Sequence, residues 1–200
     1  MWISRHLLTL FNTISSDPKK SSSSLEKVKI FSINNFWFWL TPCKATEDTS
    51  ELEVTTVGSV DTSKEGIYPI QYLATNSDGF DGAITRYVLV TPDKNTIVNN
   101  DLSGTYWRSN NSSREVQVSK VTDGFYQITD AFPTNGVPVT FAQTSASKIV
   151  IWEQSSRFGN VVADEFNDPA TAGVVIDAST IGWQLRVGSF GVFSITFNKQ

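Results

Sequence analysis

The sequence predicts an all-β protein built from two consecutive domains. From Leu52 onward the chain is rich in Val, Ile, Thr, Tyr, Phe and Trp, and apolar and polar residues alternate over short stretches. Clusters of Gly, Asn, Asp and Pro separate these stretches, and none of them has the spacing of an amphipathic helix. This combination is typical of antiparallel strands joined by turns.

The first predicted domain covers residues 44–92 and is centred on one hairpin. In residues 67–72 three alternate apolar side chains share one face, and Pro69, which cannot donate to a strand ladder, favours an edge position. An Asn-Ser-Asp-Gly turn follows, and residues 83–90 alternate as the returning strand. A linker near residues 91–100 ends this domain.

The second predicted domain covers residues 99–200 and is a small antiparallel β-barrel or sandwich of about eight strands. An Asp-Gly pair at 123–124 is a strong hairpin signal between two of the strands. The irregular connection 155–172 is the longest and therefore the expected functional loop. The candidate strands lie at 102–109, 114–120, 124–130, 137–144, 148–154, 173–178, 181–187 and 191–198.

Charge and composition exclude several classes of function. The formal net charge is -4, and the basic residues are scattered, which argues against binding of nucleic acid through its phosphates. Cys43 is the one cysteine and His6 the one histidine, so neither a disulfide framework nor a Cys/His metal site is expected. No apolar run approaches the roughly 18 residues of a transmembrane helix. We expect no cofactor and no metal.

Residues 1–43 differ from the rest and are interpreted as a leader or a non-native N-terminal segment. Lys27 and Lys29 precede a mostly apolar run that ends at Leu40, and Cys43 follows. This is the order of a degenerate lipoprotein signal, in which Cys43 would be lipidated. Two asparagines interrupt the run and a proline precedes the cysteine, so an ordinary cysteine after an apolar strand is the alternative.

The stretch GSVDTSKEGIYPIQYLATNSDG resembles a bacterial Ig-like surface repeat, as found in Cry22-type toxin modules and in surface lipoproteins of Bacteroidota. The resemblance implies an Ig-like β-sandwich module that serves as a spacer at the cell surface. The opening strand of the repeat has no counterpart before Lys44, so the module is expected to be truncated. The matching positions are Gly58, Val60, Asp61, Thr62, Gly66, Tyr68, Ile70, Tyr72, Ala74, Asn76 and Gly79.

The last hundred residues open with LSGTYWRS and resemble an uncharacterised β-barrel-like domain that follows this repeat in such lipoproteins. Gly104 and Trp107 are also loosely similar to the opening of lipocalins, with the tryptophan one residue later. The first resemblance implies a surface protein associated with nutrient capture. The second implies a carrier of a small apolar ligand.

Acidic residues raise two further hypotheses. Asn76, Asp78 and Asp81 could suggest a calcium loop, but no bidentate Glu follows at the right distance, and the stretch suits a turn. Glu153 with Asp164 or Glu165 could form the carboxylate pair of a glycosidase, although nothing in their spacing requires it. We therefore expect no enzymatic activity.

An aromatic binding face is the preferred hypothesis for the second domain. Sugar-binding proteins stack sugar rings on exposed aromatic faces and orient them with nearby polar groups. Trp107 and Trp183 are expected in the core. The candidate ligand-binding residues, at the mouth of and within the long connection, are Trp152, Glu153, Gln154, Arg157, Phe158 and Phe166.

The sequence therefore predicts a non-catalytic, extracytoplasmic binding or adhesion protein at the cell surface. Its expected partner is a polysaccharide or another extracellular nutrient, with no nucleic acid and with membrane contact only through a lipid anchor at Cys43. A lipocalin-like carrier and a module associated with glycoside hydrolysis are the alternatives.

Overall fold

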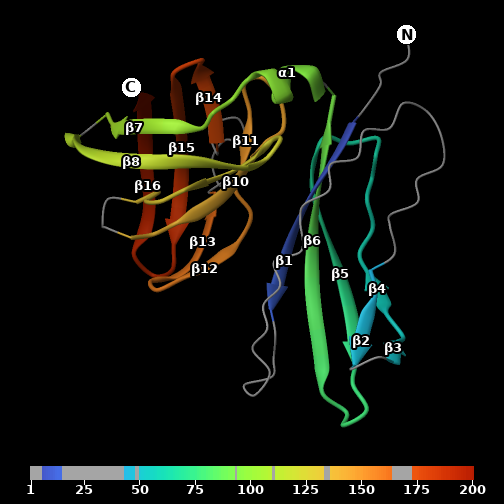
Figure 1. The fold of residues 1–200 in the computed structure, drawn as a ribbon. Helices are drawn as coiled ribbons and strands as arrows, with labels where there is room; N and C mark the ends of the chain where they lie inside the picture. Colours follow the sequence, from blue (N-terminus) through green and yellow to red (C-terminus); the bar gives the residue numbers. More distant parts are fainter. Residues whose placement is uncertain are drawn as a thin grey trace. The chain divides into compact units, whose positions relative to one another are not determined.

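The structure, a computed structural model, describes residues 6–14, 43–47, 50–92, 94–109, 111–132, 136–163 and 173–200 (Figure 1). The chain divides into two compact units, residues 1–90 and 91–200, each of which is described by itself. Nearly all described elements are strands, and the helix found among these residues is the short α1 (Lys94–Asn99). The predicted all-β class is confirmed.

The first unit contains a four-stranded sheet and a small hairpin. The sheet order is β1-β6-β5-β4, and β2 pairs with β3. Residues 6–14, which the sequence assigns to a leader, form β1 beside β6. The strands are β1 (His6–Ile14), β2 (Ala45–Glu47), β3 (Ser50–Leu52), β4 (Thr55–Val57), β5 (Gly66–Thr75) and β6 (Asp81–Thr91).

The predicted hairpin is formed by β5 and β6. Its register runs from Gly66 opposite Val90 to Thr75 opposite Asp81. Pro69 is not on an edge strand, because β5 lies between β4 and β6. The pairing with β4 begins only at Gln71, so the missing N–H of Pro69 falls outside that ladder.

The core of the first unit lies on one face of this hairpin. Ile70, Tyr72, Val88 and Val90 are buried there, as the alternation of β5 predicts. Cys43 is half-buried and packs against this cluster.

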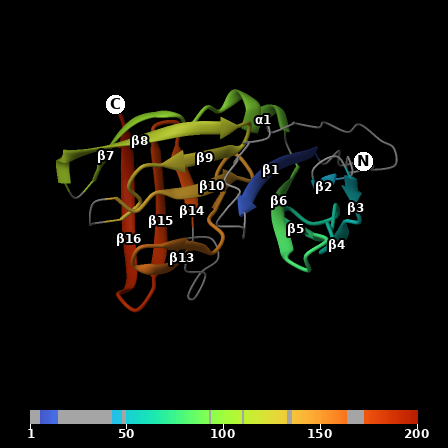
Figure 2. The same ribbon diagram turned by 60° about the horizontal axis from the view of Figure 1, so that its bottom comes forward.

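The second unit is an antiparallel meander in which most strands pair with the next along the chain, whereas β7 pairs with β16 and β13 with β15. The sheet order is β11-β10-β9-β8-β7-β16-β15-β13-β12, and β14 also pairs with β15. In Figure 2, β8, β9 and β10 run across the direction of β15 and β16, so the sheet is strongly curled. The strands are β7 (Gly104–Arg108), β8 (Asn111–Thr122), β9 (Phe125–Ile128), β10 (Val139–Gln143), β11 (Ile149–Val150), β12 (Gln154–Ser156), β13 (Gly159–Ala163), β14 (Gly173–Asp177), β15 (Thr180–Val187) and β16 (Gly191–Lys199).

The two ends of the curled sheet meet. Ala163 at the end of β13 pairs with Leu185 of β15, and Gly173 at the start of β14 pairs with Trp183, so β13 and β14 lie in line along one edge of β15. On their other edge, the Ala163 N–H donates to the Ile151 oxygen at 3.2 Å. The Val175 N–H likewise donates to the Ser147 oxygen at 3.0 Å.

These two bonds connect the segment that contains β11 with β13 and β14, which closes the meander. Because β11 with β12, and β13 with β14, each occupy one position, the ten strands fill about eight positions around the barrel. Of the two architectures that the sequence leaves open, the barrel fits this pairing and the sandwich does not.

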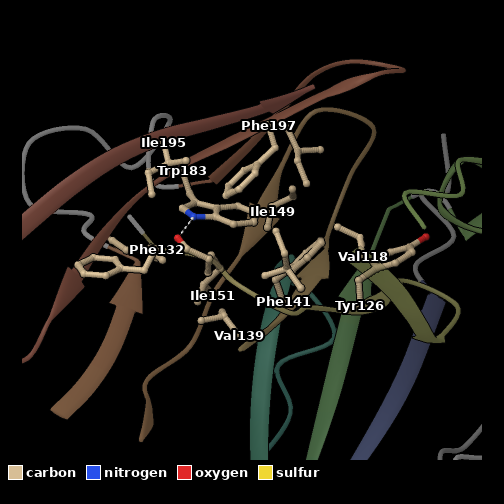
Figure 3. Packing of buried hydrophobic residues seen from close by; sticks show 14 of the residues in the cluster. Val118, Tyr126, Phe132, Val139, Phe141, Ile149, Ile151, Trp183, Ile195 and Phe197 are labelled. Atoms are coloured by element: carbon tan, nitrogen blue, oxygen red, sulfur yellow. Dashed lines mark hydrogen bonds between the residues drawn. The ribbon is translucent and has the colours of Figure 1, made fainter. Parts of the chain in front are cut away.

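Large aromatic side chains occupy the barrel interior. Tyr126 stacks on Phe141 at 5.5 Å between ring centroids, Phe141 lies 5.5 Å from Trp183, and Trp183 lies 4.9 Å from Phe197. The Trp183 indole N–H donates to the Ala131 oxygen at 3.4 Å, the bond drawn in Figure 3. All four rings are at most 4% exposed. Trp183 is therefore a core residue, as predicted.

Trp107 differs from its prediction, because it is half-buried. Its neighbours Tyr106 and Arg108 are 0% and 3% exposed. Since successive side chains of a strand point to opposite faces, burial of these two places Trp107 on the outer face of the barrel.

One end of the barrel is closed by the chain that enters β7. The Tyr106 hydroxyl donates to the Leu102 oxygen at 2.8 Å, and the Tyr126 hydroxyl donates to the Asn100 oxygen at 3.2 Å. The Lys199 ammonium donates to the Asp101 oxygen at 3.0 Å. Both tyrosine hydroxyls are thus satisfied by one short backbone segment.

Candidate functional site

Alternate connections of a meander lie at the same end of its barrel, and four of them gather at the end opposite the Asn100–Leu102 closure. We call this the hairpin end. Its described parts are Ser109 between β7 and β8, residues 129–132 and 136–138 between β9 and β10, the β12–β13 turn (157–158) and the β15–β16 turn (188–190).

Two of these turns touch through glycines. The Gly188 N–H donates to the Asn160 oxygen at 2.8 Å, and a Cβ placed on Gly159 would lie 3.0 Å from the Gly188 Cα. Side chains at these positions would separate the turns. The glycines therefore hold the neighbouring residues, Phe158 and Phe190, side by side.

Phe158 and Phe190 form an edge-to-face pair, with 5.6 Å between ring centroids and an interplanar angle of 81°. The Arg157 guanidinium carbon lies 4.6 Å from the centroid of the Phe158 ring. Phe190 is 62% exposed and Val192 40% exposed, whereas Phe158 is half-buried and packs against the barrel core. The result is an exposed aromatic surface with a cation stacked on it, which we call the aromatic cluster (Arg157, Phe158 and Phe190).

A second aromatic pair, Phe132 and Phe193, packs at the hairpin end. Phe132, in the β9–β10 connection, contacts Phe193 of β16 edge to face at 4.5 Å. Phe132 is 4% exposed, so this pair anchors the connection and does not offer a surface.

The structure divides the sequence-predicted site residues into two groups. Arg157 and Phe158 lie together in the aromatic cluster. Trp152 is half-buried and meets the edge of Phe125, with 6.3 Å between ring centroids. Trp152 thus packs on Phe125, whereas Phe158 packs on Phe190.

Glu153 and Gln154 are engaged with the barrel wall. The Gln154 side-chain oxygen accepts from the Thr140 N–H at 2.8 Å, and its amide donates to the Thr140 oxygen at 2.6 Å. The Glu153 carboxylate accepts a hydrogen bond from the Asn160 side chain. Both residues therefore brace the strand that leads to the aromatic cluster.

Phe166 lies outside the described residues, as do Asp164 and Glu165 of the glycosidase hypothesis. In the part of the chain that is described, no group of three or more His, Cys, Asp and Glu side chains could hold a metal ion. The Asn76 side-chain oxygen accepts from the Phe80 N–H at 2.7 Å, and Asp81 accepts from the Thr75 hydroxyl at 2.7 Å. These acidic and amide groups stabilise the β5–β6 turn.

Phe190 was missed by the sequence analysis. It lies in the turn Gly188-Ser189-Phe190-Gly191, where a large apolar residue is flanked by two turn glycines. A phenylalanine at the tip of a hairpin lies on no strand face that could bury it. Its position between two glycines therefore indicates an exposed aromatic side chain.

An ion cluster lies at the start of the β9–β10 connection. Asp130 bonds Arg108, with 3.2 Å between Oδ1 and Nη2, and Arg114, with 2.8 Å between Oδ2 and Nη2. Arg108 is 3% exposed, and burial lowers its pKa, which Asp130 partly offsets and Arg114 lowers further. Two guanidinium groups thus share one carboxylate at the hairpin end.

Fold and site together define an all-β protein in which a unit of small antiparallel sheets precedes a curled meander barrel with an exposed aromatic end. Residues 41–90 match the family model described as a bacterial surface protein, Ig-like domain. The resemblance of the first unit to such surface repeats is therefore confirmed, and it indicates an extracytoplasmic, surface-associated protein.

The crystal structure of the lipoprotein BT2262 from Bacteroides thetaiotaomicron is similar at 21% identity over 82% of this chain and 92% of that chain, with a TM-score of 0.36. At this level of similarity nothing about the present chain is inferred from it. No curated protein matches the sequence. None of the helices among the described residues has the length and apolar content of a membrane span.

Proposed function

We propose that this surface protein is a non-catalytic binding protein whose barrel holds a glycan or a similar extracellular nutrient at the hairpin end. The single observation that carries the proposal is the aromatic cluster, in which Phe190 is 62% exposed and lies 5.6 Å from Phe158 between ring centroids. A phenyl face packs against the C–H groups of a sugar, and Arg157 can bond its hydroxyl oxygens.

The lipocalin-like alternative has less support. A carrier of this type binds its ligand inside the barrel. Here the rings of Phe141, Trp183 and Phe197 pack on one another in the interior, so an apolar ligand would have to displace well-packed side chains.

The hydrolase alternative also has less support. Glu153 is the one member of its proposed carboxylate pair that is described, and its carboxylate bonds Asn160 on the same hairpin. A glycosidase acid needs a second carboxylate about 5 to 9 Å away across a cleft, and the two candidates for it, Asp164 and Glu165, lie outside the described residues.

Affinity electrophoresis through gels that contain single polysaccharides tests the proposal. The wild type should be retarded by at least one polymer. Phe190→Ala and Phe158→Ala should lose the retardation, because Phe190 is the exposed ring and Phe158 is the ring that it packs against. Trp152→Ala should keep it, since that ring packs against Phe125.

Phe80→Ala is the matched control. Phe80 is also a turn phenylalanine, 70% exposed, but it belongs to the Ig-like unit. It should migrate as the wild type does in every gel. If no polymer retards the wild type, or if Phe80→Ala abolishes retardation as Phe190→Ala does, glycan binding at the hairpin end is wrong.

A further inference from the structure

The ion cluster at the hairpin end carries more positive than negative charge. Asp130, at the start of the β9–β10 connection, bonds both Arg108 and Arg114. Because an arginine guanidinium stays protonated in proteins, these three side chains carry a net positive charge. The whole chain has a formal net charge of -4, so this cluster departs from the average of the molecule.

The buried guanidinium of Arg108 has fewer hydrogen-bond and charge partners than it can bind. Its side chain is 3% exposed, and its Nε is buried with no hydrogen-bond partner. Its Nη2 contacts the Asp130 carboxylate at 3.2 Å and the Asp130 backbone oxygen at 3.3 Å. A buried guanidinium that must share its carboxylate favours the approach of a further anion.

The same connection links this charge to the aromatic cluster. The Val137 N–H donates to the Asp130 Oδ1 at 3.5 Å. At the preceding residue, Gly136, a Cβ would lie 3.7 Å from the Arg157 Nη2. Arg157 therefore lies along the connection that begins at the ion cluster, and its guanidinium covers the Phe158 ring.

We propose that the hairpin end selects an anionic glycan, one that carries carboxylate or sulfate groups, with Arg157 and Arg114 facing the charged groups and the phenyl rings facing the sugar. This inference rests on the proposed function and names the ligand class of the same site. The planar fork of a guanidinium matches the paired oxygens of a carboxylate or sulfate, which a neutral sugar lacks. Arg108 is too buried to touch the ligand and acts by keeping the site positive.

Titration calorimetry with matched polymers separates the possibilities. One pair is polygalacturonate and its methyl ester, and the other is dextran sulfate and dextran. Within each pair the backbone is shared and only the charge differs. We expect the protein to bind at least one charged member and to bind its neutral partner at least about tenfold more weakly, the loss expected for one charge-assisted hydrogen bond. Preference for polygalacturonate would assign carboxylate, and preference for dextran sulfate would assign sulfate.

Three variants locate the charge. Arg157→Gln and Arg114→Gln should each weaken binding of the charged polymer about tenfold. Arg114→Gln leaves Arg108 and Asp130 as a one-to-one pair, so the fold is retained and a thermal melt should verify this. Lys148→Gln is the matched control, because Lys148 is an exposed cation in the β10–β11 connection at the other end of the barrel. It should bind as the wild type does.

The outcomes distinguish the two proposals. Equal affinity for charged and neutral polymers, lost in Phe190→Ala, overturns the anionic ligand and leaves glycan binding intact. An equal loss of affinity in Lys148→Gln and Arg157→Gln also overturns it, since attraction would then be diffuse. If no polymer binds, both proposals are wrong. In about 1 M NaCl the screening length is about 3 Å, so binding through a few direct contacts should weaken but persist.

Discussion

Gly188 and Phe158 lie so close that a Cβ atom on Gly188 would be 2.2 Å from the Phe158 carbonyl oxygen. Gly188 also has a φ of +47°, in the left-handed region. Space and backbone conformation therefore both require glycine here. The aromatic cluster depends on this contact, because it fixes the β15–β16 turn, which carries Phe190, against the turn that carries Phe158.

The first prediction is that Gly188→Ala destabilises the barrel by at least about 3 kcal/mol and abolishes glycan retardation. The added Cβ must push two backbones apart. Gly191→Ala is the control, since Gly191 has a φ of +105° but no atom within 4 Å of an added Cβ. It should cost only about 1 to 2 kcal/mol, from strain alone. Urea unfolding measures both, and equal losses would contradict the steric argument.

The second prediction concerns the ion cluster. Asp130→Asn should destabilise the protein by about 3 to 5 kcal/mol, because it leaves the buried Arg108 without a counter-charge. Arg114→Gln should cost less than about 1 kcal/mol, since Arg114 is 23% exposed and Arg108 keeps its partner.

Urea unfolding of the two variants gives the comparison. A similar loss of unfolding free energy in both variants would contradict the prediction, because Arg114 would then contribute as much to stability as Asp130 does.

The third prediction is a loss of stability at alkaline pH. Burial, and to a smaller extent the charges of Tyr126 and Asp101, raise the pKa of Tyr106 to about 12, while a free tyrosine titrates near 10. A pKa raised on folding means that the protonated phenol stabilises the folded state. This stability is fully present below pH about 10 and is lost as the pH rises toward about 12, on the order of 3 kcal/mol in all.

Tyr106→Phe tests this point. At neutral pH it should cost about 1 kcal/mol, from the lost bond to the Leu102 oxygen. Between pH about 9 and about 11 its unfolding free energy should fall less than that of the wild type. An unchanged pH profile would assign the alkaline loss to other groups, of which Tyr126, whose pKa is also raised by burial, is the nearest.

Local pattern was enough to predict most strands. The alternation around Ile70, the Asp-Gly turn before Phe125 and the inward position of Trp183 all follow from side-chain period and turn chemistry, and the structure agrees with each. The prediction for Trp107 was wrong because the alternation along β7 does not show which face of the strand is buried. Tyr106 and Arg108 could equally face outward. They are buried because the closing segment and the ion cluster cover them.

Long-range geometry could not be predicted in the same way. The hydrogen bonds of Ala163 and Val175 close the barrel, but no sequence pattern indicates that these segments pair. The pair of Phe158 and Phe190 likewise depends on contact between two turns that are far apart in the sequence. Trp152 and Phe158 are close in sequence, yet Trp152 packs on Phe125 and Phe158 on Phe190. Residues that are neighbours in the sequence therefore lie in two different environments in the structure.

The last prediction concerns Cys43. The lipobox-like order before it predicts an acyl chain on its sulfur, but the side chain is half-buried and packs against Ile70 and its neighbours. Cleavage before Cys43 would also remove β1, which lies beside β6 in the sheet. These two observations favour a structural thiol.

We therefore expect that metabolic labelling with palmitate shows no incorporation that depends on Cys43, and that Cys43→Ser lowers the unfolding free energy by about 1 kcal/mol. Thr46→Ser, an exposed position on β2, is the control for unfolding and should have no effect. Label that is present in the wild type and lost in Cys43→Ser, together with a mature N-terminus at residue 43, would establish the lipid anchor instead. In that case β6 would be an edge strand in the mature protein, because the chain that pairs with it would have been removed.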